Sequence, residues 1–410
     1  MPKDVILLGT LDTKGEEYGY AKEKITERGH KVIVIDTGVL GQPTLPPDIR
    51  REEVAKAGGT TIAKLLASQE EGKVDEGKMI KVMTEGAKKI VAGLYQAEKL
   101  SGILSLGGSM GTSLCTAAMR ELPFGVPKVM VSTVASGDIR PYIGGKDIVM
   151  IPSVADMIGL NRFTKSILNR AAVIISSMVE IEAELPDKDK PTVGISVHGD
   201  LVPCMHRIKK ALEDRGYEVI VFHAVGSGGD ALEDQIRGGL IDGVIELVVY
   251  ELTASLFGGM YNAGPDRFEN AGEAGIPVLL IPGKASCICY NPALGIPDWS
   301  KGRGIWMHNP EIAVTKANEE ETALVGKVLA EKLNRAKGPT LIFFPKKGLN
   351  GFGKGWEEPA EANRAFLRAL KKHLRTGKPL VEIDAHINDE IVAKRAVSLF
   401  EDLMSHQVNK

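Results

Sequence analysis

A glycine- and hydroxyl-rich turn follows an apolar run at residues 103–114, ILSLGGSMGTSL. Glycines let backbone N–H groups approach an anion, and a helix beginning there would add the positive end of its dipole. The residues that could hold a phosphate are Gly107, Gly108, Ser109, Gly111, Thr112 and Ser113. The stretch matches neither the Walker A pattern nor G-x-G-x-x-G. An ordinary strand-to-helix turn therefore remains an alternative to a phosphate site.

The same stretch also fits G-x-S-x-G, the pattern of a nucleophilic serine on a strand–turn–helix. Ser109 would then need an acid and a histidine, and Asp384 and His386 follow it in the expected chain order. Two residues apart on one strand, these side chains would point to opposite faces. A serine hydrolase using Ser109 is therefore a third hypothesis, behind two that involve a nucleotide.

Two further turns of similar composition follow apolar runs. LGTLDTKGEE at 8–17 supplies Asp12, Thr13 and Lys14, and VSTVASGD at 131–138 supplies Ser136, Gly137 and Asp138. Lys14 can act as a point charge on phosphate, and Asp12 or Asp138 can bind Mg²⁺. Asp12 or Thr13 could equally cap a helix. Because the carboxyl ends of parallel strands meet at one edge of a sheet, we expect the three turns to form one site.

The second half of the chain carries more scattered polar candidates for a ligand cleft. They are His198, Gly228, Gly229, Glu251, Arg267 and His308. Each alone is also typical of a structural or solvated residue. The pair Cys287 and Cys289 would need two more soft ligands to bind zinc, and small buried side chains are the alternative interpretation.

The elements that position these residues are repeated. A buried-strand pattern at 4–10, a helical pattern ending at Gly29 and a second strand pattern at 31–39 recur over 191–226. Residues 101–108 likewise match 242–249, and residues 125–136 match 275–286. Repeated β-α-β units predict an α/β fold of two similar doubly wound parallel-sheet lobes. We expect lobes at 1–185 and 191–410, a linker at 186–190, and a ligand cleft between the lobes.

Composition narrows the classes of function. The chain has 410 residues, a formal net charge of −2 and a hydrophobic content of 43%. This net charge does not indicate the basic surface that binds nucleic acid. No apolar run reaches the roughly 20 residues of a membrane helix. The N-terminus enters a strand pattern without a signal-peptide plan, and four scattered cysteines suggest no disulfide framework. We therefore expect a cytoplasmic protein that contacts neither nucleic acid nor membrane.

Several motifs together resemble one protein family. GTLDTKGEE, LSLGGSMGTSL, STVASGD, DMIGLNRFTKSILNRAA, FHAVGSGGDALE and AGPDRFENAGEAGIP occur in this order along nearly the whole chain. They resemble the family that contains the ATP-binding region of the tomato mosaic virus resistance protein and its bacterial and archaeal relatives. The resemblance implies two α/β lobes, ATP and Mg²⁺ as ligands, and self-association as a homodimer. The nucleotide-binding positions that it implies are Asp12, Thr13, Lys14, Gly107 to Ser113, and Ser136 to Asp138.

The chain departs from the pattern of the family at 282–290 and at Lys316. Both positions lie in the second lobe, so a second ligand bound there is expected to differ from that of relatives. The leading hypothesis is an ATP-dependent enzyme that acts on an unidentified small molecule at the cleft between the lobes. The alternative is a nucleotide sensor without catalysis. The sequence does not identify the reaction or the second substrate.

Overall fold

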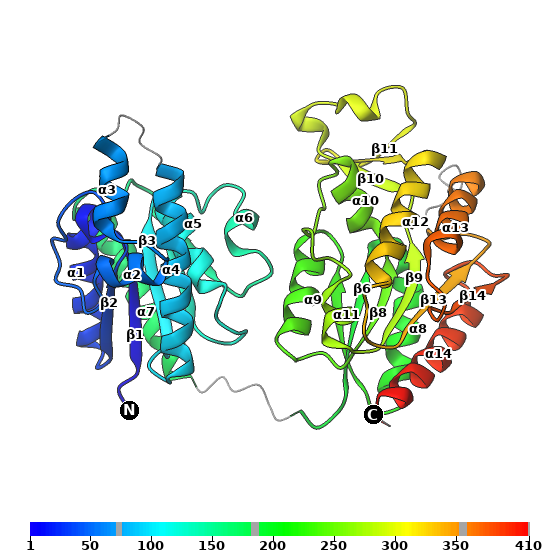
Figure 1. Ribbon diagram of the computed structural model, residues 1–410, viewed down its shortest axis with the longest axis horizontal. Coiled ribbons are helices and arrows are strands. Elements are labelled where there is room, and N and C mark those ends of the chain that lie inside the picture. Colours follow the sequence, from blue (N-terminus) through cyan, green and yellow to red (C-terminus); the bar gives the residue numbers. More distant parts are fainter. Residues whose placement is uncertain (71–75, 182–187, 352–358, 409–410) are drawn as a thin grey trace. The chain divides into compact units, whose positions relative to one another are not determined.

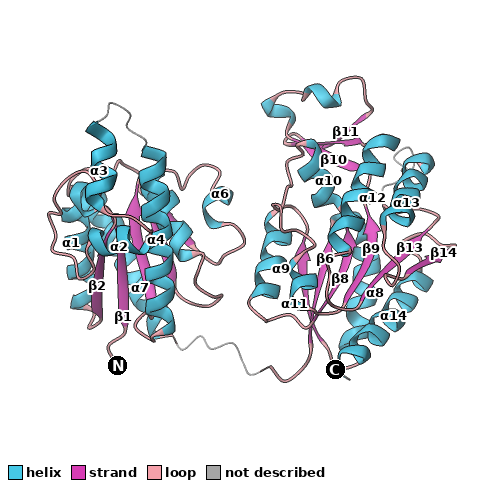
Figure 2. Ribbon diagram, viewed as in Figure 1, coloured by secondary structure: helices cyan, strands magenta, loops and turns pink. Residues whose placement is uncertain are grey.

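A computed structural model describes residues 1–70, 76–181, 188–351 and 359–408 (Figure 1). The chain divides into two compact units, Met1–Pro186 and Asp187–Lys410, and each is described by itself. Figure 2 shows a sheet flanked by helices in each unit. The predicted α/β fold with two parallel-sheet lobes is therefore confirmed. A cleft between the lobes stays a prediction.

The sheet of the N-terminal unit has five parallel strands in the order β2-β1-β3-β4-β5. The strands are β1 (Asp4–Gly9), β2 (Lys31–Asp36), β3 (Gly102–Gly107), β4 (Lys128–Ser132) and β5 (Val149–Pro152). The helices are α1 (Leu11–Glu27), α2 (Arg51–Ala57), α3 (Ile62–Glu70), α4 (Glu76–Gln96), α5 (Ser109–Met119), α6 (Arg140–Ile143) and α7 (Arg162–Glu180). The strand order reverses between β1 and β3, and this switch point is where open α/β sheets bind ligands.

Successive residues of the buried strands face opposite layers of helices. Ile6 and Leu8 of β1 pack in one core with residues of α2, α3, α4 and α5. Val5 and Leu7 pack on the other face with residues of α1 and α7. This alternation with a period of two explains why the strands read as continuous apolar runs: each is buried on both faces.

The C-terminal unit repeats this topology and extends it. Its main sheet has the order β14-β13-β9-β8-β6-β7, and all of its paired strands are parallel. The strands are β6 (Thr192–Val197), β7 (Glu218–His223), β8 (Gly243–Val248), β9 (Val278–Gly283), β13 (Thr340–Pro345) and β14 (Leu380–Ile383). Read from β7, the first five strands have the arrangement of the N-terminal sheet. The duplication in the sequence is therefore also a duplication of strand order.

Helices and a small second sheet complete the C-terminal unit. The helices are α8 (Val202–Glu213), α9 (Ser227–Arg237), α10 (Tyr250–Phe257), α11 (Asn270–Ala274), α12 (Glu319–Leu333), α13 (Ala360–His373) and α14 (Glu390–Val408). An antiparallel sheet in the order β10-β12-β11 joins β10 (Cys287–Tyr290), β12 (Ile312–Lys316) and β11 (Ile305–Asn309). The sequence did not predict this sheet. Cys287 and Cys289 lie on β10, and both are buried.

No described helix is both long enough and apolar enough to span a membrane.

Tyr18 of α1 holds the switch point of the N-terminal sheet together. Backbone pairing of β1 with β3 extends only to Leu8 and Ser105. Beyond that point the Tyr18 hydroxyl donates to the carbonyl oxygen of Leu8 at 2.6 Å and accepts from the N–H of Leu106 at 3.0 Å. A Cβ on Gly9 would lie 1.8 Å from this hydroxyl, so the position requires glycine. The Tyr18 side chain thus links β1 and β3 where their backbone hydrogen bonds end.

Replacing Tyr18 with phenylalanine should lower the free energy of unfolding of the N-terminal unit by about 1–3 kcal/mol, because it leaves buried backbone groups unpaired. Urea denaturation followed by circular dichroism measures the change. Tyr20→Phe is the matched control, since Tyr20 is only half-buried. Equal stability of the two variants would show that the Tyr18 hydroxyl does not hold the strands.

Candidate functional site

A cavity of about 380 Å³ lies at the carboxyl ends of β1 and β3, at the switch point of the N-terminal sheet. Two of the three predicted turns supply much of its wall. The lining residues are Thr10, Asp12, Thr13, Lys14, Thr37, Val39, Leu40, Met79, Ile80, Met83, Gly107, Gly108, Ser109, Met110, Gly111 and Leu114. Seven of the residues predicted from the sequence are therefore brought to one cavity.

The N-terminus of α5 forms one wall of this cavity. Gly108 is its N-cap, no side chain caps the helix, and its first turn contains no acidic residue. The first N–H groups of a helix have no acceptor within the helix. The amides of Ser109, Met110 and Gly111 therefore present hydrogen-bond donors and the positive end of the helix dipole beside the cavity.

Two hydroxyls predicted to bind phosphate, those of Thr112 and Ser113, do not line the cavity. Thr112 is fully buried; its hydroxyl is 2.8 Å from the carbonyl oxygen of Gly108 and 2.6 Å from the Ser132 hydroxyl. Ser113 is exposed and does not line the cavity. Thr112 therefore fixes the turn to the end of β4, and the cavity depends on backbone donors instead.

The turn after β2 contributes polar groups that the sequence analysis did not single out. Asp36 accepts from the backbone N–H groups of Leu11 at 3.1 Å and Gly38 at 2.8 Å, which joins the start of α1 to this turn. Burial raises the pKa of Asp36, and the nearby charge of Asp12 raises it further. Thr37 lines the cavity, is 2% exposed, and its buried hydroxyl has no hydrogen-bond partner among the described residues.

The two carboxylate oxygens of Asp12 differ in their hydrogen bonding. Its Oδ2 accepts from the N–H groups of Leu40 and Gly41, both at 3.1 Å. Its Oδ1 is buried without a hydrogen-bond partner in the described part of the chain. A buried, unpaired carboxylate oxygen is unfavourable unless a cation or donor reaches it. Asp12 therefore shapes the wall through one oxygen, and its other oxygen is buried with no described partner.

Lys14 lies at a break in the first helix, where its φ of −134° and ψ of 23° depart from helical values. Its half-buried ammonium group donates to the carbonyl oxygen of Met157 at 2.7 Å. An ammonium group has three donors, so Lys14 retains N–H groups and a positive charge beside the cavity that it lines.

The third predicted turn lies outside the cavity. Ser136, Gly137 and Asp138 are exposed and do not line it. Asp138 instead accepts from the N–H of Arg140 at 3.1 Å, next to α6. The expectation that Asp138 shares a site with Asp12 is therefore not met, because the chain continues past the strand end before these residues occur.

Apolar side chains complete the cavity wall. Val39 and Leu40 come from the turn after β2, Met79 and Met83 from α4, and Leu114 from α5. Leu40 is 65% exposed and Met110 is 55% exposed, so both can cover a ligand without leaving a core. An uncapped helix end beside an apolar wall suits a ligand with an anionic group and a flat apolar group.

The two residues predicted to activate Ser109, Asp384 and His386, make other contacts within their own unit. Asp384 and His386 belong to the other unit. His386 Nε2 lies 2.7 Å from the carbonyl oxygen of Asn350, and Asp384 forms an ion pair with Lys347 at 3.0 Å. The predicted triad partners are thus bound to other groups and not to each other.

The second-lobe candidates Gly229, Glu251 and Arg267 form a buried network. Glu251 accepts from the N–H groups of Gly226 at 2.7 Å and Gly229 at 3.2 Å, which fills the anion nest at the start of α9. A Cβ on Gly229 would lie 2.1 Å from this carboxylate. Arg267 bonds Glu251 at 2.7 Å, and it is 1% exposed. These three residues are therefore bonded within the C-terminal unit. Gly228 is half-buried in the first turn of α9, where a Cβ would lie 1.8 Å from the carbonyl oxygen of His223.

Arg267 is surrounded by three acidic residues. Besides Glu251 it bonds Glu246 at 2.6 Å and Glu233 at 3.1 Å. Burial raises the pKa of Glu233 to about 7, although Arg267 opposes the shift. One guanidinium group thus balances several carboxyl groups that could not stay buried without it.

The remaining second-lobe candidates lie apart. The ring of His198 stacks on that of His223 at 5.4 Å, and its Nδ1 lies 2.8 Å from Lys284 Nζ. Burial lowers the pKa of His198. His308 is exposed on β11, where its ring packs against Trp306 at 5.3 Å. His198 therefore follows β6 of the main sheet, whereas His308 lies on β11 of the small sheet, and no contact between the two is found among the described residues.

Fold and cavity together define a two-unit, doubly wound α/β protein with a cavity at the switch point of its first sheet. The chain belongs to the uncharacterised protein family UPF0261, whose N-terminal domain model matches residues 3–184 and whose C-terminal domain model matches residues 190–404. The resemblance noted in the sequence is therefore confirmed.

Relatives of this family match along most of the chain. A UPF0261 protein of Clostridium tetani is 42% identical over 412 residues, covering 98% of this chain and 100% of the relative. The UPF0261 protein RA0729 of Rhizobium meliloti is 34% identical, covering 98% and 99%. The ToMV resistance protein Tm-1(GCR237) of Solanum lycopersicum is 34% identical over 337 residues, covering 80% of this chain and 45% of that protein.

Solved structures match only distantly. UDP-N-acetylglucosamine 2-epimerase from Rickettsia bellii is 12% identical with a TM-score of 0.22, covering 68% of this chain and 78% of that chain. MurG of Acinetobacter baumannii is 12% identical with a TM-score of 0.22, covering 98% and 100%. Similarity at this level carries no argument about function.

Replacing Arg267 with alanine should destabilise the C-terminal unit by about 3–5 kcal/mol, because it leaves buried carboxylates without their counter-charge. Urea denaturation measures the loss. Arg237→Ala removes the same charge from a side chain that is 57% exposed, and it should change stability little. Similar effects of the two substitutions would contradict the role given to Arg267.

A fluorophosphonate probe should leave Ser109 unmodified, because the residues predicted to activate its hydroxyl, Asp384 and His386, are bonded to other groups. Mass spectrometry of the labelled protein tests this, with a known serine hydrolase as the positive control. Stoichiometric labelling that disappears in Ser109→Ala would restore the hydrolase hypothesis.

Proposed function

We propose that the chain binds a nucleotide in the N-terminal cavity, with ATP and Mg²⁺ as the ligands. The phosphates would accept from the backbone amides at the start of α5, and the base would lie among the apolar side chains opposite. The observation that supports this most directly is the uncapped start of α5 in the cavity wall. Helix N-termini of this kind bind phosphate because free N–H groups and the helix dipole act together.

The unpaired hydroxyl of Thr37 supports the same proposal independently. It is one of the buried polar atoms without a partner, and its residue lines the cavity. Such a group is expected to bond a ligand or ordered water, since an unmet buried hydroxyl is unfavourable. A polar ligand atom near the end of β2 would satisfy it.

Mg²⁺ fits the cavity through Asp12. Mg²⁺ is commonly held by one or two carboxylates together with phosphate oxygens of the nucleotide, and Asp12 Oδ1 is a carboxylate oxygen that lacks a partner. The described residues contain no group of three or more His, Cys, Asp and Glu that could hold a metal alone. Any ion would therefore need the phosphates as well. Bound there, it would neutralise their charge, and Lys14 would add a second positive charge.

An ATP-dependent enzyme and a nucleotide sensor would share this binding site. They differ in whether bound ATP is turned over in the presence of a second small molecule, so both stay hypotheses within the proposal. Self-association as a homodimer and a second substrate between the lobes also stay predictions.

Replacing Gly108 with aspartate should weaken ATP binding at least tenfold, because a carboxylate at the N-cap would take the α5 amides and repel phosphate. The nearest atom to a Cβ at this position is 3.8 Å away, and the φ of −78° suits any residue, so the fold should tolerate the change. Isothermal titration calorimetry with ATP and Mg²⁺ measures the affinity.

Gly108→Asn is the matched control, since it caps the same amides without a charge and should weaken binding less. Thermal unfolding of both variants should occur at or above the temperature of the parent chain. ATP affinity unchanged in Gly108→Asp, with the fold intact, would remove the start of α5 from the site. No binding by the parent chain at millimolar ATP would overturn the proposal itself.

A further inference from the structure

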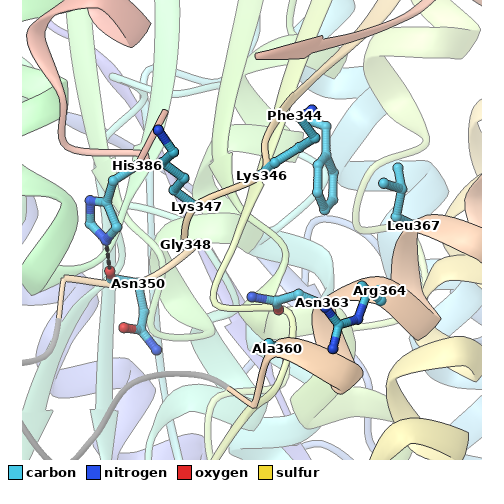
Figure 3. Close-up of a pocket in the computed structure, with 10 residues that line it drawn as sticks. All are labelled: Phe344, Lys346, Lys347, Gly348, Asn350, Ala360, Asn363, Arg364, Leu367 and His386. Carbon is cyan, nitrogen blue, oxygen red and sulfur yellow. Dashed lines mark hydrogen bonds between the residues drawn. The ribbon is translucent and has the colours of Figure 1, made fainter. Parts of the chain in front are cut away.

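A second cavity, of about 360 Å³, lies in the C-terminal unit at the carboxyl end of β13. Its wall is formed by the turn after β13, the start of α13 and His386 (Figure 3). The lining residues are Phe344, Lys346, Lys347, Gly348, Asn350, Ala360, Asn363, Arg364, Leu367 and His386. None of these residues belongs to the proposed nucleotide site, which lies in the other unit.

The described lining residues carry positive charge. Among them are Lys346, Lys347 and Arg364, and none of the described ones is acidic. Nearby carboxylates partly compensate two of these cations, because Asp384 pairs with Lys347 at 3.0 Å and Glu361 pairs with Arg364. Lys346 is exposed and forms no ion pair within the part of the chain that the structure describes. An excess of positive charge therefore remains for a ligand.

The start of α13 adds backbone donors to this charge. The helix has 14 residues, and no side chain caps its N-terminus after Pro359. Ala360, the first residue of the helix, lines the cavity. A strand end, a glycine-containing turn and an uncapped helix thus occur in the order that phosphate sites of α/β proteins use.

A buried amide points to a ligand independently of the helix. Asn350 is 5% exposed and lines the cavity, and its side chain makes no hydrogen bond to any described residue. Figure 3 shows it on one side of the space, with Asn363 and Arg364 of α13 on the other. Buried side-chain amides are normally hydrogen-bonded. A ligand oxygen between the two sides would give Asn350 the partner it lacks.

The turn that carries Asn350 is held rigidly in place. Its carbonyl oxygen accepts from His386 Nε2 at 2.7 Å, and Gly348 has a φ of +149° beside that ring. The next residue, Gly351, donates its N–H to Asp200 Oδ2 at 2.6 Å. Asp200 is itself ion-paired with the buried Lys284 at 2.5 Å. A prearranged site loses less freedom when it binds a ligand.

We propose that this cavity binds the phosphate group of a small phosphorylated metabolite, a phosphate monoester. Lys346, Arg364 and the first amides of α13 bind the phosphate oxygens, and Asn350 donates to one of them. Phe344 and Leu367 pack against the organic part of the ligand. A dianionic phosphate matches several cations and a helix end better than a singly charged carboxylate does.

Calorimetric titration of the full chain with glucose 6-phosphate, inorganic phosphate and acetate tests this site. We expect the ester and inorganic phosphate to bind and acetate to bind much more weakly, with affinity falling as NaCl rises. Lys346→Ala should lower affinity for glucose 6-phosphate about tenfold, the scale of a lost charge-assisted hydrogen bond. Asn350→Asp should lower it further, because it brings a negative charge to the phosphate.

Lys372→Ala is the matched control, because Lys372 is on the same helix but lines a different groove. It should leave the affinity unchanged. Lys346 is exposed, so its variant should fold even where Asn350→Asp does not. Gly108→Asp should also leave glucose 6-phosphate binding unchanged, which separates this site from the nucleotide proposal.

Three outcomes would overturn the proposal. The first is parental affinity in both Lys346→Ala and folded Asn350→Asp. The second is a loss of phosphate binding in Gly108→Asp alone, which would place the ligand in the N-terminal unit. The third is acetate binding as tight as that of glucose 6-phosphate, which would make the site a general carboxylate site.

Discussion

The end of backbone pairing between β1 and β3 is the constraint on which the N-terminal unit depends. Because the strand order reverses there, the helices that follow β1 and β3 leave to opposite faces of the sheet. The strands then separate, and the Tyr18 hydroxyl bonds both of them where the ladder stops. The same separation leaves room at the sheet edge. Both the cavity and the bridging role of Tyr18 therefore follow from the reversal of strand order between β1 and β3.

The two units have the same strand order, but the residues that follow the strands at the switch point differ between them. In the N-terminal unit, the turn after β3 carries glycines and a serine, and the start of α5 is uncapped. In the C-terminal unit, the corresponding turn after β8 leads into Tyr250 and Glu251, which are both 1% exposed. Glu251 supplies the anion that the nearby amides of α9 need. In the C-terminal unit, the Glu251 carboxylate thus binds helix N-terminal amides. In the N-terminal unit, an external phosphate would bind amides of the same kind, those of α5.

The sequence indicated much of this arrangement, and the reasons for its failures are physical. Strands buried on both faces read as apolar runs, so the sheets and their duplication could be predicted. The antiparallel sheet was missed because β10 and β12 are short and separated in sequence, and β11 is largely exposed and gives no apolar run. Asp12 and Gly108 were found from the turn composition that follows a strand. Met79 and Met83 were missed because periodicity identifies the buried stripe of α4 without showing which part of it faces a cavity. The pairing of Arg267 with Glu251 could not be predicted, because it depends on how the two side chains meet in the folded chain.

The lack of a side-chain cap does not by itself mark a helix end that suits a ligand. Asn161 before α7 and Asn318 before α12 accept from backbone amides in capping boxes, whereas α8, α9 and α10 begin without a side-chain cap. An N-cap side chain typically contributes about 1 kcal/mol. At α5 and α13 this contribution is missing, and both helix ends line cavities that also contain a buried polar side chain without a partner. Missing caps alone would be neutral evidence, because water can satisfy them. What supports the two anion-binding proposals is the coincidence of these helix ends with a buried residue whose side chain has no hydrogen-bond partner among the described residues, Thr37 in one unit and Asn350 in the other.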